Sequence, residues 1–502
     1  MKKTMIMIWA LVMMIALSGC MPLSVDLQRA DQPVSLPSPA GTEIESAVGD
    51  SQSAISYYVP LYFVSDDRQL VSFKRAITVQ PGQSLTEQAM LALLRADDAP
   101  GADSPFPEGT RLLGIERSGG AAVVDLSIEA RNAPTDEDLM RMREVIAATL
   151  IGLDGIEAVN ILIAGREEGL FSLPAGAISS VHEDLTAEWT RLSAEAELLS
   201  RAEGESVSVE RNVILYYPTR DGSYIAPVAS QVRVTGGDFI TPVITALMSR
   251  PEENCLLPAI PAGGQILAAK PEMVASADGR NLLKLSFDPS LISMLEREGL
   301  SEWQFCAALT YTLTGFVPGA DGLILMLGDG QLTHVERNGA EISFSGGEMT
   351  RSDYPDALCR LAKVYLSAQM GGLMEIRRAM EPLSAVSPRA LMQELFKGPA
   401  AWETGAARVM PDGVSIDDVL GVRISGGEAV VNLSSNFYRC CQSLTPQQEQ
   451  NLIYAVVNTL TSLTTVSSVR FQVEGEAADY LVRTIYLRGP LLRNPGIIRS
   501  VE

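Results

Sequence analysis

Residues 145–165 read VIAATLIGLDGIEAVNILIAG, which is the pattern of a helix end, a short connection and a strand that closes on glycine. The same pattern returns at residues 308–328, ALTYTLTGFVPGADGLILMLG, and at residues 455–475, AVVNTLTSLTTVSSVRFQVEG. Each copy contains a Thr-Leu pair, and a glycine follows the threonine by 16 residues every time. Because self-similarity at a constant spacing indicates a repeat architecture, the chain is predicted to be an array of three related units.

The composition is that of a globular protein with an acidic surface. The chain has 502 residues, of which 46 % are apolar and 20 % are charged, so it has material for several cores. Its net charge of −22 argues against a nucleic acid partner and against charge-driven binding to anionic lipid. The acidity is interpreted as a solubility feature, with a patch for a basic partner or divalent cations as the alternative.

The N-terminus has the form of an export signal. Lys2 and Lys3 precede the apolar run 5–17, which is too short to span a hydrocarbon core of roughly 30 Å as a helix. Residues 17–20, LSGC, resemble the lipobox of bacterial lipoproteins, and this resemblance implies cleavage before Cys20 and a diacylglycerol on its thiol. The protein is then expected on the extracytoplasmic face of the cell membrane, anchored through Cys20. An ordinary secreted protein with an incidental cysteine is the alternative.

Each unit is predicted to have the order ββ-α-ββ-α-β, so the fold class is mixed α+β, with three tandem domains that each place two helices on a small sheet. The predicted segments are a signal peptide at 1–19, a lipid-anchored flexible tether at 20–56, domain one at 57–170, a helical linker at 171–211, domain two at 212–330, a hairpin linker at 331–356, domain three at 357–475 and a tail without a clear pattern at 476–502. The predicted helices of the three domains span 85–95 and 135–150, 240–249 and 301–313, and 388–396 and 445–460.

The sequence shows no set of residues that indicates catalysis. His182 and His334 lie in different linkers, and neither is near a Gly-x-Ser-x-Gly elbow or a metal-spaced partner. No phosphate loop or dinucleotide fingerprint is present. We therefore predict that the protein is not an enzyme and has no catalytic, metal-binding or cofactor-binding residues.

Five cysteines follow Cys20, and none has the CxxC spacing of a zinc or redox motif: Cys255, Cys306, Cys359, Cys440 and Cys441. Cys306 is expected to be a buried thiol on a helix of unit two. A disulfide between Cys359 and either Cys440 or Cys441 is conceivable in an exported chain.

A tyrosine recurs at one position near the start of each unit, as Tyr62, Tyr216 and Tyr365. Core packing requires the same strand residue in each copy of a repeat, so these tyrosines are interpreted as core residues. A ligand-stacking role is the alternative.

The units resemble the GerM domain, a small module named for a spore-germination protein. The resemblance is carried by the Leu-Tyr strand starts, by the Thr-Leu helix ends and by PEGT at 107–110, VVDLS at 123–127, VVNLS at 430–434 and LMQELFKGP at 391–399. Units one and three match better than unit two. The resemblance implies a role in sporulation or germination, and a fold similar to the ring-building modules of envelope secretion machines.

The function that these observations favour is a non-enzymatic, lipid-anchored scaffold of the cell envelope. Its expected partners are the membrane, through Cys20, and envelope or sporulation proteins, with self-assembly as a further possibility. The alternative is a lipoprotein that binds a wall polymer or a solute in a cleft lined by aromatics of two units, such as Trp189 and Trp303. A wall hydrolase needs convergent carboxylates or a metal site, which the sequence does not display.

Overall fold

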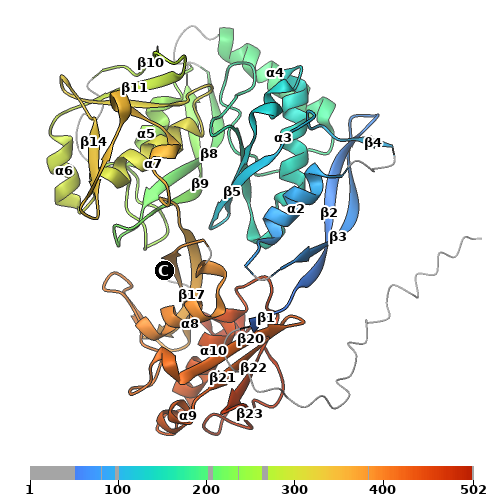
Figure 1. Cartoon of the computed structure of the whole chain (residues 1–502), viewed down its shortest axis with the longest axis vertical. Helices are drawn as coiled ribbons and strands as arrows, with labels where there is room; N and C mark the ends of the chain where they lie inside the picture. The colour runs from blue at the N-terminus through green and yellow to red at the C-terminus, as the bar shows by residue number, and fades with distance from the viewer. Residues whose placement is uncertain are drawn as a thin grey trace, which may run out of the picture. The chain divides into compact units, whose positions relative to one another are not determined.

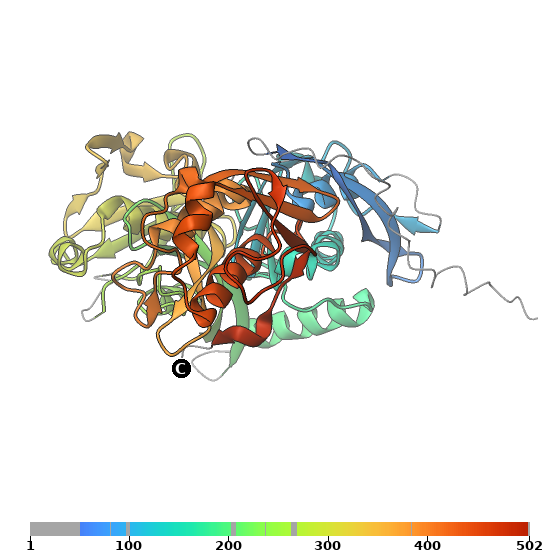
Figure 2. The same ribbon diagram turned by 90° about the horizontal axis from the view of Figure 1, so that it is seen from below.

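A computed structural model of the chain describes residues 51–80, 82–96, 101–201, 207–235, 237–262, 269–382 and 384–499. The chain divides into two compact units, Met1–Glu45 and Ser46–Glu502, and the described residues all belong to the second. The predicted signal peptide and Cys20 lie outside the described residues. Figures 1 and 2 colour the repeats in chain order, from blue through green and yellow to red.

The first repeat has the predicted order of elements. They are β2 (Ile55–Ser65), β3 (Leu70–Val79), α2 (Leu85–Leu94), β4 (Ala102–Asp103), β5 (Leu112–Ser118), β6 (Ala121–Leu126), α3 (Asp136–Leu150) and β7 (Ala158–Ile163). β2 and β3 form an antiparallel hairpin, while β6 pairs antiparallel with β5 and parallel with β7. Thr135 begins α3 by accepting a hydrogen bond from the N–H of Asp138, which satisfies one of the free donors of the first turn. α4 (Leu185–Arg201) follows this repeat.

The second repeat has the same order with one additional helix. Its elements are β8 (Ser208–Pro218), β9 (Ile225–Thr235), α5 (Ile240–Leu247), β10 (Glu272–Ala275), β11 (Asn281–Phe287), α6 (Leu291–Glu298), α7 (Glu302–Thr314) and β12 (Gly322–Leu327). The strands β13 (Gly330–Gln331), β14 (His334–Arg337), β15 (Ala340–Ser343) and β16 (Glu348–Met349) follow. The predicted hairpin turn joins β14 to β15, and both Asn338 and Gly339 have the positive φ that this turn type requires.

The third repeat again has this order. Its elements are β17 (Arg360–Ala368), β18 (Leu373–Met380), α8 (Pro388–Lys397), β19 (Ala406–Ala407), β20 (Val419–Ser425), β21 (Glu428–Leu433), α9 (Ser435–Cys441), α10 (Pro446–Leu460), β22 (Ser468–Val473), β23 (Glu476–Ala477), β24 (Leu491–Leu492) and β25 (Ile498–Arg499). The 3-10 turns of the described residues span Ile128–Asn132, Leu153–Gly155, Ser345–Gly347, Arg351–Asp353, Ser384–Val386, Ile416–Asp418 and Pro495–Ile497.

The mixed α+β class and the tandem modules are thus confirmed. Hydrogen-bond pairing of the described strands divides each repeat into two small sheets, one built on the long hairpin and one in which the closing strand lies parallel to its neighbour. The predicted domain boundaries stay predictions.

The repeated threonine fixes the last long helix of each module to the hairpin. Its hydroxyl oxygen accepts a hydrogen bond from the backbone N–H of the recurring tyrosine in all three repeats. The distances are 3.1 Å for Tyr62 to Thr149, 3.0 Å for Tyr216 to Thr312 and 3.1 Å for Tyr365 to Thr459. A strand N–H buried under a helix needs such an acceptor, which explains why the two residue types recur together.

The closing glycines are not all structurally equivalent. Ala164, Glu474 and Gly328 each donate their N–H to the last residue of the neighbouring strand, and all three have a positive φ. By this bond Gly328 corresponds to Ala164 and Glu474, and not to Gly165 and Gly475. The connection after the threonine is therefore one residue longer in the second repeat, although the spacing to a glycine is the same.

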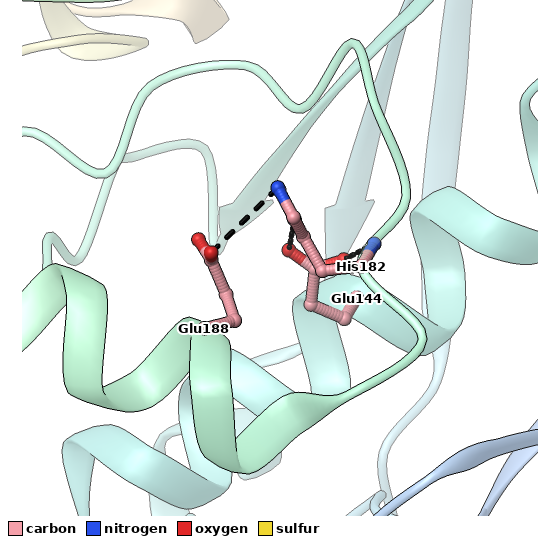
Figure 3. A group of neighbouring side chains, drawn as sticks. All are labelled: Glu144, His182 and Glu188. Atoms are coloured by element: carbon pink, nitrogen blue, oxygen red, sulfur yellow. Dashed lines mark hydrogen bonds and ion pairs between the residues drawn. The ribbon is translucent and has the colours of Figure 1, made fainter.

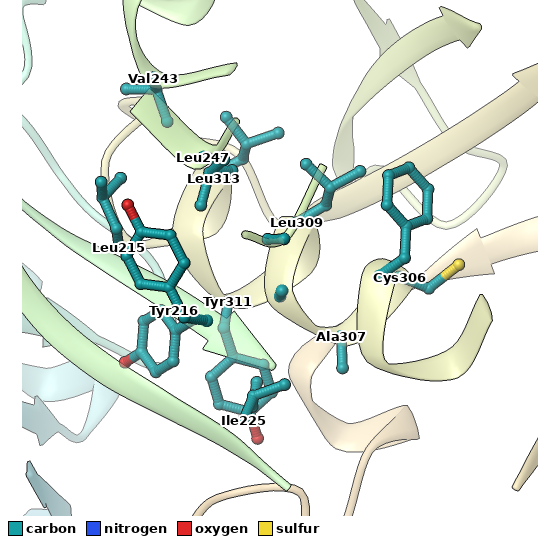
Figure 4. Packing of buried hydrophobic residues seen from close by; sticks show 14 of the residues in the cluster. Leu215, Tyr216, Ile225, Val243, Leu247, Cys306, Ala307, Leu309, Tyr311 and Leu313 are labelled. Carbon is teal, nitrogen blue, oxygen red and sulfur yellow. The ribbon is translucent and has the colours of Figure 1, made fainter. Parts of the chain in front are cut away.

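Each repeat has its own hydrophobic core, but the first two cores meet across one sheet. Ala122, Val124 and Leu126 of β6 belong to the core of the first repeat. The alternate residues of β6 and β7 belong to the core of the second repeat: Ala121, Val123, Ala158 and Leu162. A sheet buried on both faces has near-continuous apolar strands, and β6 reads AAVVDL. Figure 4 shows part of this second core.

Backbone and amide hydrogen bonds add to the junction of the first two repeats. The Asn160 side-chain amide donates to the carbonyl of Gly315 at 2.7 Å. Glu167 donates its N–H to the carbonyl of Thr314 at 2.9 Å and accepts from the N–H of Gly319 at 2.8 Å. The turn after β7 is therefore attached to the end of α7.

The first and third repeats are also in contact. β1 (Ser51–Gln52) pairs parallel with β20, and the Tyr57 hydroxyl donates to the carbonyl of Thr464 at 3.0 Å. The N–H of Leu361 donates to the Ser118 hydroxyl at 3.2 Å. α4, which lies in the predicted helical linker, packs on the core of the first repeat through Leu185, Trp189 and Leu192.

A segment after each repeat adds an antiparallel partner to the closing strand. β16 pairs with β12, β24 pairs with β22, and Ile178 forms an isolated bridge with Val159. The C-terminal tail, predicted to lack a pattern, therefore contributes a strand to the third repeat. A strand of only two residues leaves too weak an alternation to be recognised from sequence.

Candidate functional site

The recurring tyrosines lie where these added segments meet the modules. Tyr216 is 1 % exposed and Tyr365 is fully buried, which confirms the core interpretation for these two, while Tyr62 is half-buried. In the second and third repeats, each tyrosine belongs to a group that also contains a glutamate and an arginine. We call these groups the Tyr216 group and the Tyr365 group.

The Tyr216 group joins two repeats. The Tyr216 hydroxyl donates to a carboxylate oxygen of Glu116, which comes from β5 of the first repeat. Arg351 donates to the other oxygen of Glu116 at 3.0 Å and lies 4.6 Å from the ring centroid of Tyr311. The rings of Tyr216 and Tyr311 are themselves in contact, with 5.2 Å between their centroids. Figure 4 labels both residues. Burial raises the pKa of Glu116, and the positive charge of Arg351 opposes this rise without cancelling it.

The Tyr365 group lies within one repeat. The Tyr365 hydroxyl donates to Glu375 at 2.6 Å, and Arg493 donates to the same hydroxyl. The Arg493 guanidinium lies over the Tyr365 ring, 5.0 Å from its centroid. Burial tends to raise the pKa of Glu375, but the hydrogen bond from Tyr365 and the charges of Lys363 and Arg377 outweigh it, so this pKa is lowered. The two groups therefore have the same chemistry and opposite shifts of the carboxyl pKa.

The two arginines occupy equivalent places. Arg351 donates to the carbonyl of Tyr311 at 2.7 Å, and Arg493 donates to the carbonyl of Asn458 at 3.3 Å. Each of these carbonyls directly precedes the repeat threonine. In the first repeat, serines lie at the positions that correspond to Glu375 and Arg493 of the third repeat. Ser72 faces Tyr62 across the hairpin, and Ser180 lies two residues after Ile178, which bridges to Val159.

A second polar cluster surrounds His182, between α3 and α4 (Figure 3). His182 Nδ1 lies 3.3 Å from a carboxylate oxygen of Glu144, and its Nε2 lies 3.6 Å from one of Glu188. The backbone N–H of His182 donates to the other oxygen of Glu144 at 3.3 Å. One donor atom from each of the three residues lies within 4.8 Å of the others, and an imidazole with two carboxylates is a donor set that suits divalent transition metals.

The bonds of this cluster are nevertheless satisfied without an ion. Arg191 donates to both oxygens of Glu188, at 2.8 and 2.6 Å, and both ring nitrogens of His182 face a carboxylate. Burial raises the pKa of Glu144, against the opposing effect of the N–H of His182. The arrangement holds α4 on α3 and leaves little donor capacity for a metal. The sequence prediction missed it because Glu144 precedes His182 by 38 residues, a distance at which spacing carries no signal.

The other histidine and the cysteines form no site with their predicted partners. His334 is exposed on β14 beside Thr333. All five described cysteines are free thiols, and Cys306 is fully buried as predicted. The disulfide considered for Cys359 is not formed, because Cys359 lies in the core of the second repeat whereas Cys441 lies in that of the third. Burial raises the pKa of the thiols of Cys255 and Cys441 to about 12, so both are inert near neutral pH.

Trp189 and Trp303, which the alternative hypothesis placed in one aromatic cleft, do not lie together. Trp303 is 2 % exposed in the second core, with the Arg337 guanidinium 4.2 Å from its ring centroid. Trp189 packs against Phe171 on the first core, with 4.7 Å between ring centroids. The two indoles therefore lie in separate cores and do not line a common cleft.

These features define a class of protein: a tandem array of small α+β modules joined by buried polar groups. The family described as Germane, sporulation and spore germination, matches residues 60–169 and 363–479. These regions are the first and third repeats, which share structural details such as a bulge early in β5 and in β20. The chain is therefore a GerM-like protein built of repeats, with the family match covering its first and third repeats.

Three solved structures are similar to the chain. The tandem GerMN domains of the sporulation protein GerM from Bacillus subtilis match with 16 % identity and a TM-score of 0.24, over 58 % of this chain and 100 % of that one. The first GerMN domain of the same protein matches with 20 % identity and a TM-score of 0.22, over 26 % and 96 %. A candidate lipoprotein from Clostridium perfringens matches with 23 % identity and a TM-score of 0.16, over 24 % and 80 %. No curated protein matches.

Among the described residues, no helix has both the length and the apolarity to cross a bilayer.

Proposed function

We propose that this GerM-like protein is a non-enzymatic, lipid-anchored scaffold of the cell envelope that acts in sporulation or spore germination. The observation that carries the proposal is the fusion of the first two repeats across the doubly buried sheet of β6 and β7. Such a fusion fixes two copies of one module relative to each other. An array of fixed modules can present several contact sites at once, so that weak single contacts add up to stable attachment.

Exposed apolar side chains give each module a surface on which partners can pack. They are Tyr58 and Leu113 in the first repeat, Met273 in the second, and Met370 and Leu492 in the third. Met370 is 98 % exposed at the turn between β17 and β18, where burial by a partner would remove most of its apolar surface from water. Single exposed apolar side chains are common on protein surfaces, so these residues are positions at which to look for contacts and do not by themselves favour a binding role.

The non-enzymatic part of the proposal is supported by the state of the titratable clusters. The carboxylates of the His182 cluster are engaged by Arg191 and by the ring itself, and those of the Tyr216 group by Arg351. A general base must be within reach of a substrate proton, and these groups are already taken up by the fold.

The lipid anchor can be tested by replacing its cysteine. In spore-forming cells, Cys20→Ser is expected to shift the protein from the membrane fraction to the soluble extracytoplasmic fraction, as measured by fractionation and immunoblotting. Cys440→Ser, at a half-buried thiol, is the matched control and is expected to stay with the membrane. A Cys20→Ser protein that remains membrane-bound and lipid-labelled contradicts the anchor.

The scaffold role can be tested by crosslinking with mass spectrometry on the native protein in sporulating cells. Crosslinks from the exposed apolar positions to envelope assembly proteins, or to a second copy of the chain, are expected. Absence of such crosslinks, with peptidoglycan fragments co-purifying instead, would count against a scaffold and for a binding protein.

A further inference from the structure

We infer that the cavity between the first and third repeats binds a small phosphate-bearing group. The cavity has a volume of about 140 Å³, and both repeats line it. Pockets for drug-sized ligands are larger, roughly 300 Å³ or more, so this one fits a single compact group. The inference does not depend on the scaffold role.

The lining is basic in a chain whose net charge is −22. Arg117 comes from β5 of the first repeat, and Arg360, Lys363 and Arg377 come from β17 and β18 of the third. None of the described lining residues is an aspartate or a glutamate. Arginine and lysine are the side chains that proteins use to bind phosphate, by charge-assisted hydrogen bonds.

The cations of the third repeat share a single carboxylate. Lys363 lies 3.3 Å and Arg377 lies 3.4 Å from one oxygen of Glu375. The other oxygen of Glu375 accepts from Tyr365 and lies 3.9 Å from Arg493. One negative charge therefore faces three positive charges. Arg117 and Arg360 have interactions of their own, and an excess of basic over acidic lining residues favours an anion without requiring an unpaired group.

Neutral donors complete the lining. Residues 82–85 bring the start of α2 to the cavity, and Ser84 is at the N-cap position without a hydrogen bond from its side chain to the helix. The free N–H groups and the dipole of a helix start favour an anion, and α2 has 10 residues. Ser462, Thr464 and Thr465 of the third repeat also line the cavity, although the Ser462 hydroxyl already donates to the carbonyl of Thr459.

An adjoining cavity is lined by two acidic side chains. It shares Arg117 and Arg360 with the first cavity and is also lined by Glu87 and Glu116. Glu116 is already bonded to Arg351 and to Tyr216. The part of the first cavity at Lys363 and Arg377 has no acidic residue among its described lining residues.

The test is equilibrium dialysis of the purified full chain against radiolabelled inorganic phosphate at low salt. Saturable binding at one site is expected, and Lys363→Gln is expected to weaken it about tenfold, since a hydrogen bond to a charged group is worth at least that factor. Arg117→Gln, which changes the wall of the first repeat, is expected to weaken it similarly. Circular dichroism spectra unchanged from the wild type establish that both variants are folded.

Lys284→Gln is the matched control. Lys284 is also a strand lysine of similar exposure, 36 % against 40 % for Lys363, and it also pairs with one glutamate, Glu272 at 3.1 Å. Binding by this variant is expected to equal that of the wild type. The inference is overturned if the wild type shows no saturable binding at concentrations up to about 10 mM, or if Lys363→Gln and Lys284→Gln bind alike.

Vesicles distinguish the two sources of the phosphate group. Phosphatidylglycerol vesicles that displace the labelled phosphate, when phosphatidylcholine vesicles do not, identify a lipid headgroup as the ligand. Displacement by glycerol phosphate and not by either vesicle identifies a soluble phosphate ester. Either pattern supports the site, whereas displacement by chloride at equal ionic strength overturns it.

Discussion

The Tyr216 group and the Tyr365 group contain the same three residue types, but they differ in which repeat supplies the glutamate. In the third repeat the acid is Glu375, which faces Tyr365 across its own hairpin. In the second repeat Pro227 faces Tyr216, and the acid is Glu116 of the first repeat. A repeat that contains its own glutamate can form the whole polar group by itself. A repeat whose glutamate comes from a neighbour can form the group only when that neighbour is in contact with it.

This difference agrees with the burial of the two groups. Arg351 and Glu116 are 13 % and 22 % exposed, while Arg493 and Glu375 are 35 % and 28 % exposed. The more buried group also lies where the first two cores meet. We conclude that the Tyr216 group links the folding of the first two repeats, and that the Tyr365 group stabilises the third repeat locally.

Arg351→Ala is expected to have the largest effect on stability. It leaves the carboxyl of Glu116 buried without its ion pair, and loss of one partner of a buried pair costs about 3–5 kcal/mol. Urea denaturation measures this loss. Arg297→Ala, at an exposed arginine of α6, is the control and is expected to change stability by less than about 0.5 kcal/mol.

Glu167→Gln tests the same junction through pH. Burial raises the pKa of Glu167 to about 7, although the charge of Arg143 opposes the rise. A carboxyl whose pKa is raised by folding stabilises the folded state below its unfolded pKa, near 4.5, and this contribution is lost as pH rises to about 7. Because glutamine does not ionise, the variant does not lose this stability as the pH rises. Relative to the wild type, it should gain about 3 kcal/mol of stability between pH 4.5 and 8.

The sign of this pH effect is the critical result. Denaturation curves of both proteins at several pH values give the difference in unfolding free energy. A difference that stays constant with pH would show that folding does not shift the pKa of Glu167.

Replacing the repeat threonines tests whether the three modules use one device. Thr149→Val, Thr312→Val and Thr459→Val each remove the acceptor of a tyrosine N–H while keeping the shape. Each is expected to cost about 1–2 kcal/mol in thermal or urea unfolding, since a buried donor is left unsatisfied. Ser200→Ala on α4, at an exposed residue, is the control. A variant that costs nothing would remove its repeat from the set.

Arg493→Ala is expected to have the smallest effect. Arg493 is 35 % exposed and its charge lies 3.9 Å from Glu375, so water screens much of the interaction. A loss of about 1 kcal/mol or less is expected in the same urea assay. A loss as large as that for Arg351→Ala would remove the contrast between the two groups.

The sequence predicted what is local in this fold. The Thr-Leu helix ends, the helix at 135–150 and the hairpin in the linker at 331–356 depend on interactions over a few residues, and each was found at its predicted place. The glycine spacing misled in the second repeat, because a connection longer by one residue still reached a glycine. Equal spacing cannot show which of two adjacent residues carries the strand-end hydrogen bond.

The polar groups could not be predicted, because their members are far apart in the chain. Glu116 and Arg351 are separated by 235 residues, and no periodicity links them. The basic cavity likewise combines Arg117 with Lys363. The near-continuous apolar sequence of β6, AAVVDL, is the signal that could have indicated burial of this sheet on both faces, but the sequence interpretation did not use it.

Hydrogen exchange of the wild type and of Arg351→Ala tests the link between the first two repeats most directly. The variant is expected to lose protection in β6 of the first repeat and in β8 of the second together, while β21 of the third repeat keeps its protection. Loss confined to β8, or an equal loss in β21, would contradict the conclusion that the Tyr216 group links the first two repeats.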